Sequence, residues 1–215
     1  MAFGFSTEAG SGGNFTPVVK INAKQGRVWR VDRTQGGDGW ETNEVDITND
    51  FQFVPDFANM EIGWMHFAAG QAPDLRMVRL GEVMPDRPTP NHKQGVRLKV
   101  KLGKTSGGDI REIAATAKTI LSPFDKLHDA YVAGLKDNAG KAPVVRMSGM
   151  KKIDMKTAHG TNTNFEPVFE IVKWVDAPAE LVGGQPANEP QQQAQQQMKT
   201  TSQTQEQPEE GGEEF

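Results

Sequence analysis

Three cationic side chains recur at every second position in the segment between Gly95 and Gly103. They are Arg97, Lys99 and Lys101, and they alternate with Val96, Leu98, Val100 and Leu102. Because a β-strand sends successive side chains to opposite faces, this alternation predicts a strand with one apolar and one cationic face. A row of cations can bind the phosphates of a nucleic acid. The same pattern is also typical of a solvated sheet face, or of an edge strand protected by charge.

The sequence around this segment concentrates positive charge. Residues 76–156 carry 17 basic and 8 acidic side chains, a net charge of +9, although the whole chain has a net charge of −4. Residues 183–215 contain six Glu and one Lys, a net charge of −5. A basic segment combined with a detached acidic end indicates a polyanionic partner and a tail that competes for its site.

Aromatic residues lie among these cations, as binding of single-stranded nucleic acid requires. Such proteins hold the phosphates in a cationic groove and stack the bases on aromatic faces. The predicted phosphate-binding residues are Arg30, Arg97, Lys99, Lys101, Lys104, Arg146, Lys151 and Lys152, and the predicted stacking residues are Trp29, Trp40 and Phe53. Trp64 and Trp174 lie in segments that are apolar on both faces, which favours a place in the core.

Short strands must position these residues. Strand patterns cover residues 15–22, 27–33, 40–54, 60–68, 76–80, 96–102, 144–147, 150–155 and 167–175. Between them, apolar residues from Ile110 to Leu121 recur at helical spacing, with Asp109 and Glu112 placed as a capping box. Ser122-Pro123 predicts the start of a second helix that ends near residue 139. The sequence therefore predicts a mainly β fold, a barrel or sandwich, with a helical insertion over residues 109–139.

Composition divides the chain into three parts. Residues 1–13 are rich in Gly and Ser and predict a flexible N-terminal arm. Residues 14–182 predict the nucleic-acid-binding domain. Residues 183–215 are mostly Gly, Pro, Gln, Asn, Thr and Glu, and predict a disordered linker followed by an acidic tail.

Signals of catalysis are weak. The chain has no cysteine, and its four histidines are far apart in sequence, so no catalytic residue, cofactor or metal is expected. Gly103-Lys104-Thr105 resembles the end of a phosphate-binding loop, but the glycine required five residues earlier is replaced by Leu98. No apolar run is long enough for a membrane span, and we expect a soluble, cytoplasmic protein.

The chain ends in Glu209, Glu210, Gly211, Gly212, Glu213, Glu214 and Phe215. A β-rich body, a Gln/Pro-rich linker and an acidic end with a terminal phenylalanine resemble bacterial and bacteriophage single-stranded-DNA-binding proteins. The resemblance implies an OB-like β-barrel interrupted by helices. It also implies that Glu209, Glu210, Glu213, Glu214 and Phe215 recruit replication or recombination proteins and compete with DNA.

We therefore expect a non-enzymatic protein that protects single-stranded DNA in replication, recombination or repair, in a bacterial cytoplasm or a phage-infected cell. A virion or assembly protein with a solubilising or docking tail is the alternative from another class. RNA stays an alternative to DNA, because every base has a face that can stack. A homo-oligomer is left open.

Overall fold

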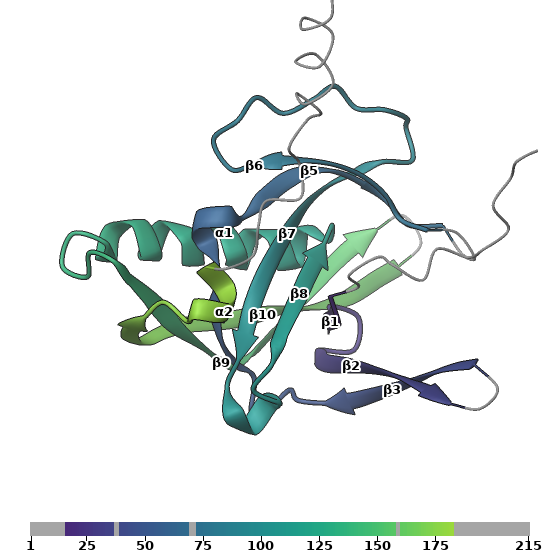
Figure 1. The fold of residues 1–215 in the computed structure, drawn as a ribbon. Helices are drawn as coiled ribbons and strands as arrows, with labels where there is room; N and C mark the ends of the chain where they lie inside the picture. The colour runs from purple at the N-terminus through teal and green to yellow at the C-terminus, as the bar shows by residue number, and fades with distance from the viewer. Residues whose placement is uncertain (1–15, 37–38, 69–71, 158–159, 183–215) are drawn as a thin grey trace, which may run out of the picture. The chain divides into compact units, whose positions relative to one another are not determined.

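The structure is a computed structural model, and it describes residues 16–36, 39–68, 72–157 and 160–182 (Figure 1). The side chains of Trp40, Thr157 and Val182 and the exposure of Gly36 are not part of this description. The predicted arm over residues 1–13 and the predicted linker and tail over residues 183–215 lie outside the described residues.

Strands dominate the described chain, which confirms the predicted mainly β fold. The strands are β1 (Val18–Asn22), β2 (Arg27–Gly36), β3 (Gly39–Asp46), β4 (Gln52–Pro55), β5 (Glu61–His66), β6 (Asp74–Arg79), β7 (Lys93–Leu102), β8 (Ile110–Ala115), β9 (Lys141–Thr157) and β10 (Gly160–Asp176). The helices are α1 (Lys118–Gly134) and α2 (Ala179–Val182), with short 3-10 turns at Phe57–Asn59 and Lys104–Ser106.

β7 is the strand around which the sheet is arranged (Figure 1). On one side it pairs with β5 over residues 93–97 and with β4 over residues 100–102, and on the other side it pairs with β8. The sheet continues from β8 to β1, β2 and β3, and from β4 to β9 and β10, while β6 pairs with β5. All these pairings are antiparallel except that of β1 with β8.

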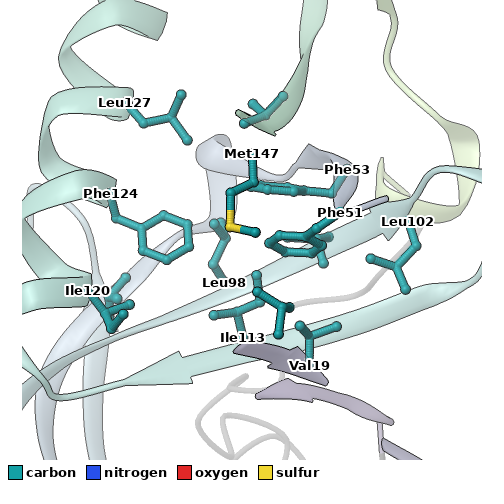
Figure 2. Close-up of a cluster of buried hydrophobic side chains, with 14 of the residues drawn as sticks. Val19, Phe51, Phe53, Leu98, Leu102, Ile113, Ile120, Phe124, Leu127 and Met147 are labelled. Atoms are coloured by element: carbon teal, nitrogen blue, oxygen red, sulfur yellow. The ribbon is translucent and has the colours of Figure 1, made fainter. Parts of the chain in front are cut away.

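The apolar face of β7 forms the centre of the hydrophobic core (Figure 2). Val96, Leu98, Val100 and Leu102 are each at most 3% exposed, as their alternation predicts. Phe51 and Phe53 stack on each other beside them, and Ile120, Phe124 and Leu127 of α1 complete the cluster. The core therefore forms between the sheet and one face of α1.

The predicted helix over residues 109–121 is wrong, because residues 110–115 form β8. Gly107 and Gly108 have φ angles of 127° and 75°, which glycine adopts without strain, and they reverse the chain directly after β7. The returning segment pairs with β7 along its length, so backbone hydrogen bonding outweighs the helical spacing of Ile110 and Ile113. A single helix follows, and it begins at Lys118 rather than at the predicted Ser122.

The hairpin of β9 and β10 reaches back to the turn between β1 and β2. The Phe165 N–H donates to the Ala23 carbonyl at 2.7 Å, and Lys24 Nζ donates to Asn162 Oδ1 at 2.9 Å. Gly26 in this turn has a φ of 63°, and a Cβ there would overlap the Phe165 ring. These contacts hold the hairpin against the start of the β1–β2–β3 meander.

Candidate nucleic-acid interface

The cationic face of β7 is the outer face of the sheet, which we define as the face turned away from the hydrophobic core. Arg97, Lys99 and Lys101 are half-buried there, while their strand neighbours fill the core. This arrangement confirms the two-faced strand that the alternation predicts.

Strand pairing extends the outer face from β7 to Trp29. Lys99 lies opposite Glu112 of β8, Glu112 lies opposite Val18 of β1, and two residues further along β1 Lys20 lies opposite Trp29 of β2. Residues opposite each other share a face of the sheet, and so do residues two apart on one strand. The half-buried Trp29 ring and the cations of β7 therefore belong to one surface.

Carboxylates lie between these cations, and the sequence reasoning did not anticipate them. Arg97 contacts Glu112 at 2.8 Å and Glu61 at 3.4 Å, and Lys101 contacts Glu180 of α2 at 2.5 Å. The hydrogen bond to Glu112 raises the pKa of Arg97, and the hydrogen bond from Lys101 lowers the pKa of Glu180. Glu112 could have been identified only from the pairing of β7 with β8, because that pairing places it opposite Lys99.

Lys99 differs from its two neighbours on β7. Within the described part of the chain it forms no ion pair, although Glu112 lies opposite it in the register. A second lysine of this surface, Lys20, contacts Glu44 at 2.6 Å. Lys99 is therefore the member of the row whose ammonium is not paired with a described carboxylate.

The two other predicted stacking residues have different outcomes. Phe53 is 0% exposed, stacks on Phe51 with ring centroids 4.8 Å apart, and meets Phe169 edge-on. The Phe53 ring is covered on both faces, so the prediction that it stacks on a base is wrong. β4 lies between β7 and β9 in the sheet, and Phe53 points from it into the core. Trp40 lies in β3 opposite Gln35, and its side chain is outside the described structure.

Arg30 points away from the outer face and belongs to a partly buried charge cluster. Its guanidinium binds Asp32 at 2.8 Å and donates to the Ser106 carbonyl. Arg111, whose side chain is 7% exposed, binds Asp32 at 2.6 Å, Asp109 and the Val31 carbonyl. Burial raises the pKa of Asp32, but hydrogen bonds from Arg30 and Arg111 outweigh it and leave that pKa below its usual value. Arg30 therefore lies apart from the β7 cations with its guanidinium bound to Asp32, and its phosphate-binding role stays a prediction.

The remaining predicted cations are spread over other elements. Arg146 of β9 lies opposite Gln52 of β4 and contacts Glu170 at 3.2 Å. Lys151 and Lys152 are consecutive on β9, so their side chains point to opposite sides of the β9–β10 hairpin. Lys104 is exposed in the turn between β7 and β8.

Residues 103–105 do not form a phosphate-binding loop. Gly103 caps the 3-10 turn Lys104–Ser106, which joins two antiparallel strands instead of opening a helix. A phosphate-binding loop requires the amides of a helix N-terminus at this point. Across the described ranges, no three His, Asp or Glu side chains are grouped closely enough to hold a metal ion.

The tail residues Glu209, Glu210, Glu213, Glu214 and Phe215 lie outside the described structure. The last described element, α2, lies against β7: Leu181 is 4% exposed, and Glu180 is the residue that contacts Lys101. No helix in the described residues is both long enough and apolar enough to cross a membrane. No protein-family model, curated protein or solved structure shows significant similarity to this chain.

Proposed function

We propose that this chain is a sequence-tolerant single-stranded-DNA-binding protein without enzymatic activity, acting in replication, recombination or repair in the cytoplasm. The observation that carries the proposal is the shared outer face of Trp29 and the β7 cations. A strand of DNA lying across β7, β8, β1 and β2 would place phosphates at Lys99 and Lys101 and a base on Trp29. Stacking on an aromatic ring is worth about 1–3 kcal/mol per base and needs no particular base.

An OB-like barrel is the architecture that we propose for residues 14–182. Three features support it: the β1–β2–β3 meander, the pairing of β1 with β8, and the contacts of the β9–β10 hairpin with the β1–β2 turn. OB-folds bind oligonucleotides on an exposed face of their strands, which matches the position of the outer face. The helix α1 would close one end of the barrel core.

The acidic C-terminal residues have a second proposed role. With a net charge of −5 over residues 183–215, the tail would compete with DNA for the cations of the outer face. Released by DNA, Phe215 and its neighbouring glutamates would recruit replication or recombination proteins. Removing residues 209–215 should therefore strengthen DNA binding at low salt, and unchanged or weaker binding would contradict this role.

A titration with fluorescently labelled oligo-dT at about 50 and 200 mM salt tests the proposed function. We expect salt-sensitive binding accompanied by quenching of tryptophan fluorescence, with the quenching largely lost in Trp29→Leu. The combined variant Arg97→Gln, Lys99→Gln and Lys101→Gln should bind weakly, and Lys126→Gln on α1 is the control for the loss of a single exposed cation elsewhere. Oligo-rU in parallel distinguishes RNA from DNA. Absence of salt-sensitive binding to both would refute the proposal and favour a virion or assembly protein.

A further inference from the structure

Phe165 of β10 is an aromatic residue that the hydrophobic core does not use. It is half-buried, and it belongs neither to the buried core cluster nor to the partly buried side chains that pack against that cluster. By contrast Phe169, four residues further along β10, meets the rings of Phe51, Phe53 and Phe124. Packing in the core therefore explains the phenylalanine at position 169 but not the one at position 165.

The turn between β1 and β2 fixes the position of the Phe165 ring. The Phe165 N–H donates to the Ala23 carbonyl at 2.7 Å, which anchors β10 to the turn at this residue. A Cβ added to Gly26 would lie 2.8 Å from Cγ of the ring and 3.0 and 3.1 Å from its two Cδ atoms. Because these two distances are nearly equal, Gly26 lies over a face of the ring and not at its edge. A ring held in this way loses little freedom when a base stacks on it.

Two lysines belong to the same junction between the turn and the hairpin. Lys152 of β9 lies opposite Phe165 in the register, so the two side chains share one side of the hairpin. Lys24 of the turn is exposed and donates to Asn162 of β10 at 2.9 Å. The side chain of Lys152 is 61% exposed, and it contacts Asp154 at 3.3 Å. Exposed ion pairs of this kind are weak, so a phosphate can replace the carboxylate.

The junction lies next to the end of the outer face that carries Trp29. Gly26 precedes Trp29 by three residues, which span at most about 10 Å of extended chain. That span corresponds to about three nucleotide steps at the rise of about 3.4 Å in duplex DNA. Asn164, on the other side of β10, is 7% exposed, so the alternation along β10 leaves Phe165 on the more exposed side of the hairpin.

From these observations we infer that Phe165 and Lys152 form a second nucleotide-binding site, in which the Phe165 ring stacks on a base and the Lys152 ammonium binds an adjacent phosphate. The site rests on the proposed function for the identity of its ligand, single-stranded DNA. It extends the path of the DNA from the sheet to the β9–β10 hairpin. Stacking and a phosphate contact need no particular base, so the site is sequence-tolerant.

Tryptophan fluorescence reports whether a base reaches this ring. In a Trp29→Leu background, Phe165→Trp places a new fluorophore at the site, and oligo-dT should restore the quenching that Trp29→Leu removes. The control is Val132→Trp in the same background, at a position on α1 that is 50% exposed. Absence of restored quenching, or equal quenching at both positions, overturns the inference.

The two neighbouring lysines of β9 provide a matched pair of charge variants. Lys151 and Lys152 are both exposed, but their side chains point to opposite sides of the hairpin. Lys152→Gln should lower the slope of log K against log salt by up to about 0.7, the value for one phosphate contact with a single strand. Lys151→Gln should leave the slope unchanged, and equal slopes for the two variants overturn the role of Lys152.

Two substitutions of Phe165 separate a binding role from a structural one. Phe165→Leu should weaken oligo-dT binding about five- to tenfold, the lower part of the range for one stacked base, while Phe165→Tyr keeps the ring and should bind like the native chain. A urea titration shows whether each variant stays folded. Equally weak binding by both variants overturns the stacking role, because the ring alone would then not account for the loss.

These measurements also distinguish the second site from the proposed function. Salt-sensitive binding of oligo-dT that is unchanged in Phe165→Leu and Lys152→Gln overturns the second site and leaves the proposed function standing. A native chain that does not bind oligo-dT overturns the proposed function, and with it the ligand of this site.

Discussion

Neutralising Glu180 should strengthen DNA binding, because this carboxylate occupies Lys101 in the unbound protein. The two groups are 2.5 Å apart, and the side chains of Lys101 and Glu180 are 26% and 58% exposed. A phosphate that binds Lys101 must first displace Glu180, which then regains a counterion from solution. We expect Glu180→Gln to bind oligo-dT about two- to fivefold more tightly, since exposed ion pairs are weak and easily exchanged.

The salt dependence gives a sharper test than the affinity alone. Each phosphate contact to a single strand contributes about 0.7 to the slope of log K against log salt, or about 2.6-fold in affinity between about 50 and 200 mM. Lys99 has no ion pair to a described residue, so Lys99→Gln should lower the slope by the full amount. Lys101→Gln should lower it by less in the native chain and by the full amount when Glu180→Gln is also present.

Fluorescence anisotropy over a salt series measures both quantities for the four members of this double-mutant cycle. The control is Asp129→Asn on α1, which changes the net charge equally at an exposed position away from the sheet. The reasoning is refuted if Glu180→Gln binds no more tightly than Asp129→Asn. It is also refuted if Lys101→Gln changes the slope equally in both backgrounds, because Glu180 would then not compete for Lys101.

Three further predictions concern stability. Arg111→Met should lower the free energy of unfolding by about 1–3 kcal/mol, because the Val31 carbonyl loses its donor while Asp32, which keeps Arg30, and Asp109 each lose a cationic partner, and a urea titration showing no loss would contradict this. The pKa of Asp32 is below 3.8 in the folded protein, so its ionised form stabilises the fold above that pH and the benefit is lost as the pH falls through the folded pKa. Unfolding of Asp32→Asn and the native chain should therefore differ most near neutral pH and converge in acid, and a constant difference would argue against this role. Gly134→Ala should destabilise α1 by about 1–3 kcal/mol despite the better helix propensity of alanine, because its Cβ would overlap the Trp174 ring that stacks on Tyr131, and a rise in melting temperature would rule this out.

Local patterns predict the strands well where side chains alternate. In residues 96–102 the alternation of apolar and cationic residues predicts the two faces of β7, and the structure confirms the prediction. The segment after Asp109 fails for the opposite reason. Its apolar residues fit a helix about as well as a strand, and only pairing with β7, which local spacing does not contain, makes it β8.

The candidate interface is predicted less completely than the fold. Trp29 and the β7 cations are named from residue types alone, and the register brings them to one face. Phe53 is named with Trp29 as an aromatic residue in a strand pattern, but it lies in the core. The carboxylates Glu61, Glu112 and Glu180 come from three other elements, so their closeness to β7 depends on topology that no local pattern records.

The parallel pairing of β1 with β8 affects how the chain folds during synthesis. β2 follows β1 directly, but β8 begins only at Ile110, and the Phe165 contact with Ala23 comes later still. Until β7 and β8 are made, an early chain therefore carries a β1–β2–β3 meander with two open edges, of which β8 later covers that of β1. Contacts between such distant residues slow folding, and an open edge can pair with other chains. The nascent protein is thus most prone to aggregate before β8 covers the edge of β1.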